Sequence, residues 1–325
     1  MKEYKKLNYY SLQILLILLS IIANFIYIIC YNLNMKKSTH EKRAKIANYV
    51  MNYIYKYIDT NINIDELSLQ LNISKFHLHR VFKEEFGKNI YESIKSIRLE
   101  KAANLLITNK FSTITNISNM TGYSSQTSFL RAFKQRFSMT PKEWKNGGYK
   151  DYSNKIVEEF SQDIKTKDFS NIEPTIVKMP QMRGYYIRHK GYDKTIKQTW
   201  AKLQTWIYTN DIKSYKQMAL HHDNPIITPL EDCQYIAIVV LDENEELKDL
   251  SLPTLDIPKG IYAKFSLSGK YGDVIKLIQW VYHVWLIDSG YETTTNPSYT
   301  IYEKNHFLSL DGEFILDFYL PIKYV

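Results

Sequence analysis

Two stretches of the chain repeat one pattern, "SKFHLHRVFKEEFG" at 74–87 and "SQTSFLRAFKQRFS" at 125–138. Laid over each other, they share Ser, Arg, Phe, Lys and Phe in register. Serine is a favoured helix N-cap, and the phenylalanines recur every four residues, as on one face of a helix. The repeat therefore predicts two copies of one amphipathic, basic helix, each starting after a serine.

A shorter helical pattern precedes each copy: "NIDELSLQLNIS" at 63–74 and "TITNISNMTGYS" at 113–124. The first is expected to begin at Asp65 as its cap and to turn at Asn72, and the second to turn at Gly122. A helix, a short turn and a second helix make a helix-turn-helix unit. The sequence thus predicts two such units in an all-α domain.

The expected second helices keep polar side chains near their N-terminal ends. Arginine, histidine, glutamine and threonine can read base edges in the major groove, while a capped helix N-terminus favours a phosphate. A continuous helical pattern of about 20 residues, at 89–109, joins the units and predicts a rod of roughly 30 Å. Successive major-groove faces lie roughly 34 Å apart. One chain would therefore supply both half-site readers.

Charge is distributed unevenly along the 325 residues, whose formal net charge is +8. Residues 36–150 hold 20 Lys and Arg against 9 Asp and Glu, a net of +11, whereas residues 151–325 hold 19 against 24, a net of −5. This asymmetry indicates that the first part meets a polyanion. The only cysteines, Cys30 and Cys233, exclude a disulfide framework.

Residues 40–146 carry both helix-turn-helix patterns and the excess of basic residues. They resemble the DNA-binding domain of the AraC/XylS family of bacterial transcription regulators. The resemblance runs through "ISKFHLHRVFKEEFG", "IRLEKAANLL" and "GYSSQTSFLRAFKQRFSMTPKEW". It implies promoter DNA as a partner, with RNA polymerase as a further one. It implies base-facing roles for Phe76, His79 and Arg80 in the first unit and for Gln126, Thr127 and Arg131 in the second, and phosphate contacts for Ser74, Lys75 and Ser125. Phe82, Phe133 and Trp144 are expected in the core.

The second half changes to β-rich patterns after a polar stretch that we interpret as a linker, 151–171. Strands are expected at 173–180, 182–191, 216–223, 233–241, 259–269, 297–304 and 313–322, and helices at 194–208 and 271–287. The order predicts an α+β domain of two βαββ repeats with a cleft at their junction. Six aromatic residues could line the cleft, although at least half should be ordinary core: Tyr185, Tyr186, Trp200, Trp206, Trp280 and Trp285.

Residues 172–325 resemble the GyrI-like effector-binding domain, through the repeat, "HHDNPIITPLEDCQYIAIVV" and the ending "YTIYEK…DFYLPIK". The resemblance implies a small-molecule effector bound by Tyr185, Trp200 and Trp280. Family members often carry a glutamate just before the Ile-Tyr pair. Here Thr300 takes that place and Glu303 follows three residues on, so both are candidate ligand-binding residues and a cation pocket is not expected.

The combined prediction is a multidomain, one-component transcription regulator. The alternative is a GyrI-like enzyme or toxin-binding module with an autoregulatory DNA reader. We expect no catalytic residues, cofactor or metal site, since there is no nucleophile-elbow motif and His221 and His222 are adjacent on a strand. Cys233 is expected to be a buried strand residue. Turnover by residues 172–325 alone would favour the enzyme.

The predicted boundaries are 1–35, an apolar leader; 36–150, the DNA-binding domain; 151–171, the linker; and 172–325, the effector domain. The leader contains "SLQILLILLSIIANFIYIICYNL" at 11–33, about long enough to span a bilayer. A second interpretation, which we prefer, is a start assigned too early, with Met35 as the natural beginning. The two interpretations predict a membrane-tethered and a cytoplasmic regulator, respectively.

Overall fold

The computed structural model describes residues 41–161, 168–242, 247 and 251–324. The leader predicted at 1–35 therefore lies outside the described residues. The described chain forms two compact units, one of residues 41–50 and 64–89 and the other of 51–63 and 90–324. The division runs through the helical region, so the two predicted helix-turn-helix units belong to different compact units.

The first unit contains the beginning of a helix over 41–56, then α2 (Ile64–Gln70) and α3 (Lys75–Phe86). Ser74 caps α3, whose last turn closes on Gly87 in the left-handed conformation, φ 71°. Asn72, φ 52°, makes the predicted turn. Asp65 is not the cap of α2, because the helix begins one residue earlier and places Asp65 in its first turn.

The second unit begins with residues 51–63 and continues through α4 (Ile90–Thr108), α5 (Ile114–Met120) and α6 (Gln126–Phe137). Thr113 and Ser125 cap α5 and α6 through their side-chain oxygens. Gly122 turns between them at φ 79°. The predicted connecting rod is confirmed as the 19-residue α4.

A short capped segment ends the helical region: α7 (Pro141–Glu143), the π-helix η1 (Trp144–Gly148) and α8 (Tyr149–Ser161). Thr140 and Glu143 form a reciprocal capping box at its start. Trp144 is fully buried, as predicted, and its Nε1 donates to the Ala103 carbonyl oxygen at 3.0 Å. Since α8 runs to Ser161, much of the predicted linker is helical.

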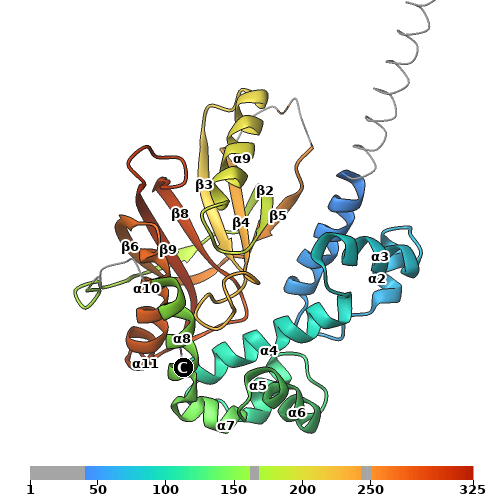
Figure 1. Cartoon of the computed structure of the whole chain (residues 1–325), viewed down its shortest axis with the longest axis vertical. Helices are drawn as coiled ribbons and strands as arrows, with labels where there is room; N and C mark the ends of the chain where they lie inside the picture. Colours follow the sequence, from blue (N-terminus) through green and yellow to red (C-terminus); the bar gives the residue numbers. More distant parts are fainter. Residues whose placement is uncertain (1–40, 162–167, 243–246, 248–250, 325) are drawn as a thin grey trace, which may run out of the picture. The chain divides into compact units, whose positions relative to one another are not determined.

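The strands of the remaining described residues form one antiparallel sheet, which Figure 1 shows with all strands but β1 and β7 labelled. The first repeat supplies β2 (Met182–Lys190), β3 (Tyr215–His221) and β4 (Gln234–Leu241), and the second β6 (Gly260–Lys270), β8 (Ser298–Lys304) and β9 (Glu313–Tyr324). Three further strands are β1 (Thr175–Met179), β5 (Thr254–Ile257) and β7 (Tyr291–Thr293). The short β5 and β7 were not predicted.

The strand order shows the predicted duplication. Among the described residues it runs β1-β6-β9-β8-β3-β4-β2-β5, with β7 paired to β9. Exchanging β2 with β6, β3 with β8, β4 with β9 and β5 with β1 reverses this order onto itself. The two repeats therefore meet at the β3–β8 pair, where Ala219 is opposite Thr300.

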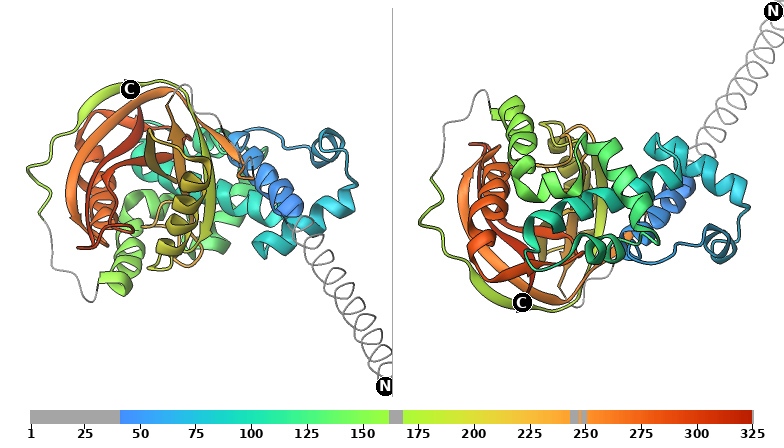
Figure 2. Two further views of the ribbon diagram at one scale, coloured as in Figure 1. Left: turned by 90° about the horizontal axis from the view of Figure 1, so that it is seen from above. Right: turned by 90° about the horizontal axis from the view of Figure 1, so that it is seen from below.

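Helices lie against one face of the curved sheet, seen from two sides in Figure 2. They are α9 (Ile196–Asn210) and a continuous helical run of α10 (Asp273–Trp280), the π-helix η2 (Val281–Trp285) and α11 (Leu286–Asp288). Residues of both helices share one hydrophobic cluster with alternate residues of the strands. The other residues of the central strands form a second cluster, so these strands are buried on both faces.

The helix-side cluster does not stop at the sheet domain. It contains Leu105 and Phe133 from the helical region together with Trp200 and Phe318 from the sheet domain. In the second compact unit, the second helix-turn-helix and the sheet domain therefore share a core. In the described part of the chain, no helix is both long enough and apolar enough to cross a membrane.

Candidate nucleic-acid interface and effector site

The N-terminal end of α3 carries the side chains predicted to contact DNA from the first unit. The Ser74 Oγ accepts the His77 amide at 3.2 Å, which orders the first turn. Phe76 is 77% exposed, although a large apolar side chain gains from burial. Lys75 pairs with Asp65 at 2.5 Å on the helix before it, and His79 is half-buried. The structure thus brings these predicted residues to one exposed helix end.

Arg80 is held by its own helix. One guanidinium nitrogen lies 3.1 Å from His77 Nδ1, and Nε lies 3.9 Å from Glu84 Oε1. Glu84 also accepts from Arg43 at 3.4 Å. All of these charged groups are at least 40% exposed, so the ion pairs are individually weak. If Arg80 contacts a base edge as predicted, it must first leave this arrangement.

The equivalent end of α6 is less constrained. The Ser125 Oγ accepts the Ser128 amide at 3.5 Å. Gln126, Thr127 and Arg131 are exposed beyond it. Within the described residues, the Arg131 guanidinium makes no hydrogen bond or ion pair with another side chain. The second predicted set is therefore also brought together, with its arginine unengaged.

Packing beneath each helix explains why these polar ends are presented. Phe129, Phe133 and Phe137 lie at least 98% buried, with ring centroids 5.6 and 4.6 Å apart in succession. Trp144 closes the row at 4.7 Å from Phe137. In α3, Phe82 is fully buried. The predicted core roles are confirmed. Because the buried residues recur every four positions, they lie on one face of each helix, and the polar residues lie on the other.

Aromatic residues fill the helix side of the sheet domain, where the two repeats meet. Trp200, in the first half of α9, donates its Nε1–H to the Tyr235 hydroxyl at 3.0 Å. The Tyr235 and Tyr302 hydroxyls are 3.2 Å apart, and burial raises the pKa of Tyr235 well above its usual value. A buried chain of hydrogen-bonded aromatic side chains thus connects α9, β4 and β8.

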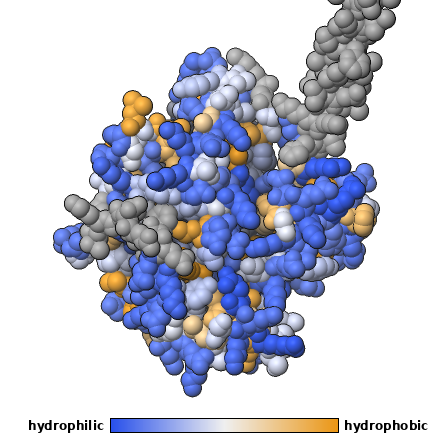
Figure 3. All heavy atoms as spheres, in the orientation of Figure 1, coloured by the Kyte–Doolittle hydropathy of each residue, from blue (hydrophilic) through white to orange (hydrophobic). Residues whose placement is uncertain are grey.

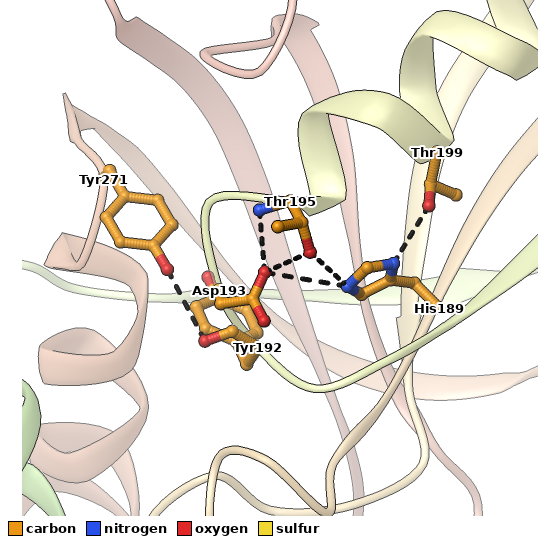
Figure 4. A network of polar contacts seen from close by, with 6 residues as sticks. All are labelled: His189, Tyr192, Asp193, Thr195, Thr199 and Tyr271. Atoms are coloured by element: carbon orange, nitrogen blue, oxygen red, sulfur yellow. Dashed lines mark hydrogen bonds and ion pairs between the residues drawn. The ribbon is translucent and has the colours of Figure 1, made fainter.

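A second aromatic contact relates the repeats to each other. Tyr192 follows β2 and Tyr271 follows β6, the equivalent strand, and their rings stack with centroids 6.2 Å apart. The Tyr271 hydroxyl donates to the Tyr192 carbonyl oxygen at 3.5 Å (Figure 4). Tyr192, Tyr235, Tyr271 and Tyr302 were not among the predicted residues, although they make the aromatic contacts between the repeats. The "Gly-Tyr" that follows the first strand of the first repeat was the available signal.

The predicted effector-binding residues are only partly brought together. Trp200 is 99% buried, whereas Tyr185 and Trp280 are half-buried. The ring centroids of Tyr185 and Trp206 are 5.0 Å apart. Of the six aromatics considered for a cleft, three are buried core, as expected: Tyr186, Trp200 and Trp206. Tyr186 belongs to the cluster on the opposite face of the sheet.

Thr300 and Glu303 lie on opposite sides of β8. Thr300 is fully buried and alternates with Tyr299, so it shares the helix-side face with Tyr302. Glu303 is exposed, next to an irregularity in the β8–β9 pairing. The buried aromatic cluster therefore meets a threonine where the resemblance leads one to expect a carboxylate, and Glu303 is not brought to it.

His189 and Asp193 make a polar network at the start of α9 (Figure 4). The His189 Nδ1 lies 3.0 Å from the Thr199 Oγ1 and the Nε2 lies 3.2 Å from the Thr195 Oγ1. Asp193 accepts the Thr195 amide at 2.7 Å and also its hydroxyl. In a catalytic triad the carboxylate holds the ring nitrogen opposite the nucleophile. Here the Asp193 carboxylate lies 3.8 Å from His189 Nε2, the same nitrogen that faces the Thr195 hydroxyl, so the arrangement is not that of a triad. The network instead orders the β2–α9 turn.

The remaining candidate chemical groups are buried. Cys233 is 95% buried just before β4, its Sγ lies 3.6 Å from the Thr228 carbonyl oxygen, and burial raises the pKa of its thiol. His221 lies against Tyr235 and Phe318, whereas the ring of His222, just after β3, stacks on that of Tyr55 with centroids 3.7 Å apart. No three His, Cys, Asp or Glu side chains are grouped to hold a metal ion in the part of the chain that is described.

Comparison with known proteins matches both halves of the chain. The model of a GyrI-like small molecule binding domain matches residues 172–323, and that of a helix-turn-helix domain matches residues 67–147. The probable transcription factor PqrA of Proteus vulgaris is 36% identical over 109 residues, which cover 32% of this chain and 88% of PqrA.

Two further similarities are to a curated regulator and to a solved structure. The xylose operon regulatory protein of Escherichia coli (strain K12) is 38% identical over 96 residues, 30% of this chain and 24% of that protein. The chain thus spans about a quarter of that regulator's length. The crystal structure of the EcmrR C-terminal domain is 18% identical, with a TM-score of 0.36, and covers 48% of this chain and 99% of that one.

Proposed function

Because this chain belongs to the AraC/XylS family of transcription regulators and carries a GyrI-like domain, we propose that it binds promoter DNA under the control of a small molecule. Residues 36–150 would be the reader and residues 172–325 the sensor, joined through 151–171. Promoter DNA of a bacterium lies in the cytoplasm, so this function places the protein there.

The observation that carries the DNA-binding part is the duplicated helix. Both α3 and α6 are 12 residues long, start at a serine cap and end at a left-handed residue. Each presents polar side chains at its N-terminal end, which is the end that contacts base edges in helix-turn-helix proteins. We therefore assign base contacts to Phe76, His79 and Arg80 and to Gln126, Thr127 and Arg131. Ser74, Lys75 and Ser125 would hold phosphates.

Sequencing the DNA fragments that co-purify with the full chain tests this part. A regulator with two readers should enrich a site with two half-sites about one helical turn apart. A variant with both Arg80→Ala and Arg131→Ala should lose the enriched site while it keeps nonspecific DNA affinity. Unselective recovery of genomic DNA by the wild type would contradict sequence-specific binding.

The sensor part rests on the aromatic cluster between the repeats. Rings of Trp200, Tyr235 and Tyr302 could bind an aromatic or amphipathic effector by apolar contact, with their polar atoms orienting it. Tyr185, Trp280 and Thr300 complete the proposed effector-binding set. Glu303 is left out of it, because it is exposed on the other side of β8. Binding should quench tryptophan fluorescence, because Trp200 would exchange its contact with Tyr235 for the ligand.

Coupling between sensor and reader would follow from linkage. A ligand changes DNA affinity only by its differential affinity for two arrangements of the protein, typically 1–3 kcal/mol. The shared core between the second helix-turn-helix and the sheet domain supplies a physical connection. A change in contact with RNA polymerase is a second output of the same linkage, and run-off transcription would separate it from DNA affinity.

We propose no catalytic role. The relatives that match are transcription regulators, and the thiol of Cys233 is buried with a raised pKa, which disfavours its nucleophilic thiolate. Hydrolysis of ester or amide substrates by purified full chain, lost on Cys233→Ala, would contradict this proposal. The same result would support the alternative of an enzyme that regulates its own gene.

A further inference from the structure

A polar cavity lies within the second compact unit, where α4 meets the sheet domain. Lys101 and Asn104 from α4, His221 and Asp223 from the end of β3, and Thr294 and Ser298 from the chain around the start of β8 are among its lining residues. Its volume is about 30 Å³. One water requires roughly 10–15 Å³ of such space, so the cavity holds two or three waters or one small polar group.

Hydrogen bonds between α4 and the sheet domain hold the walls of the cavity together. The Asn224 Nδ2 donates to the Asn104 Oδ1 at 2.7 Å, and the Thr108 and Thr293 hydroxyls are 2.7 Å apart. Lys101 donates to the Thr295 carbonyl oxygen. The helix that joins the two readers therefore forms one wall of the cavity, and the sheet domain forms the other.

Lys101 and His221 are lining groups with unused donor capacity, and the Nδ1 of His222, which also lines the cavity, has no hydrogen-bond partner among the described residues. Lys101 is 92% buried, and an ammonium has three hydrogens, of which the Thr295 contact uses one. Burial lowers the pKa of Lys101 to about 8, so it remains mostly charged at neutral pH. His221 is 93% buried, and its Nε2 has no hydrogen-bond partner among the described residues. Burial lowers its pKa to about 4, so the ring is neutral and can donate from Nε2.

The acidic groups nearby are already occupied or neutral. The Asp223 Oδ1 accepts the Tyr55 hydroxyl at 3.0 Å and Oδ2 accepts the Gln234 amide at 2.6 Å. Glu100, beside Lys101 on α4, has its pKa raised to about 8 by burial and then by the charge of Asp223. It is therefore mainly protonated at neutral pH. Each Asp223 oxygen thus already accepts a hydrogen bond, whereas Lys101 and His221 still offer N–H donors that an anion could accept from.

We infer that this cavity binds the oxyanion group of a small molecule, a carboxylate or a phosphate, with Lys101 and His221 as its donors. The site is separate from the aromatic cluster. An anion bound there would contact α4 and the sheet domain at once, and would stabilise the arrangement in which they meet. Its expected effect on DNA affinity rests on the proposed function, but its binding does not.

The test is thermal unfolding of the full chain in sodium acetate or sodium phosphate, against sodium chloride at equal ionic strength. We expect a saturable rise in melting temperature with one of the two oxyanions at millimolar concentration. The anion that acts distinguishes a carboxylate from a phosphate ligand. Lys101→Met, which keeps the apolar stem, should weaken the apparent affinity at least tenfold.

Lys95→Met is the matched control, because Lys95 lies exposed on the same helix and its loss changes the net charge equally. It should keep the full effect. His221→Phe preserves ring contacts with Tyr235 and Phe318, so it should fold and yet lose the effect, even if Lys101→Met fails to fold. An equal shift in wild type and His221→Phe, or no saturable shift in either anion, would overturn the site.

Fluorescence anisotropy with the enriched DNA site then separates anion binding in the cavity from its proposed effect on DNA affinity. If the anion binds and the variants lose it while DNA affinity never changes, the site stands and its regulatory role is refuted. If no specific DNA site exists at all, the thermal measurement still decides whether the cavity binds an oxyanion.

Discussion

The two readers should respond unequally to loss of their arginines. A bidentate arginine contact to a base contributes about 1–3 kcal/mol of discrimination, which corresponds to roughly 5- to 150-fold in affinity. Arg131 has no competing partner among the described side chains, so Arg131→Ala should show the whole loss. Arg80 must first leave Glu84, at 3.9 Å. An exposed pair of this kind is worth about 0.2–1 kcal/mol, so Arg80→Ala should cost that much less.

Glu84→Gln sharpens this comparison, because it removes the competing acid without shortening the side chain. It should increase specific affinity by up to about fivefold, which is the converted value of 1 kcal/mol. The same change in an Arg80→Ala background should increase specific affinity less, since only the general repulsion between Glu84 and DNA remains to be relieved. The difference between the two backgrounds isolates the Arg80–Glu84 competition.

Fluorescence anisotropy with the enriched site and with a scrambled duplex measures these effects at one fixed salt concentration. Arg183→Ala is the control, because Arg183 is exposed on β2 of the sheet domain and its loss changes the net charge equally. It should bind both duplexes like the wild type. The reasoning would be refuted if Arg131→Ala bound the site like wild type, or if Arg80→Ala were the more damaging change.

Three further predictions concern the sensor, pH and one turn. Thr300→Glu should create a preference for a permanently cationic ligand over its neutral isostere, measured as paired thermal shifts, and no change would show that Thr300 does not face the ligand. The pKa of Glu100 is raised to about 8, so the folded state binds the proton more tightly than the unfolded state, and the free energy of unfolding should fall as pH rises from 4.5 to 8. Glu100→Gln should therefore melt at a higher temperature than the wild type at pH 8 but not at pH 4.5, by about 2–4 °C for each 1 kcal/mol. Parallel pH profiles of the two proteins would contradict this. Gly122→Ala places a Cβ 2.6 Å from the Ile58 carbonyl oxygen and should lower the urea midpoint more than Gly87→Ala, whose Cβ meets nothing within 4 Å; equal losses would show that only positive φ matters.

Much of the helical region was predictable because its signals are local. Ser125 as a cap and Phe129, Phe133 and Phe137 at four-residue spacing act within one helix, and the structure confirms each of them. The cap of α2 was misplaced because an acidic residue is favourable both as a cap and in the first turn. Asp65 therefore did not distinguish the two positions.

The sheet domain was predictable in its repeats and less so in its site. Alternating and apolar runs identified the six strands of the two repeats, because burial of one or both faces leaves a pattern within each strand. Which rings meet was not predictable, since Trp200, Tyr235 and Tyr302 come from separate elements. The short strands β5 and β7 were also missed, because four and three residues carry too little pattern.

Two capped, amphipathic helices of one design and a duplicated α+β half could be predicted from the sequence alone. These features depend on hydrogen bonds and periodic burial within a few residues. No sequence pattern indicates that Tyr55 donates to Asp223, 168 residues away, or that Lys101 and His221 line one cavity. Such meetings depend on how separate elements pack, and the free energy of a buried polar group depends on the partners that packing supplies.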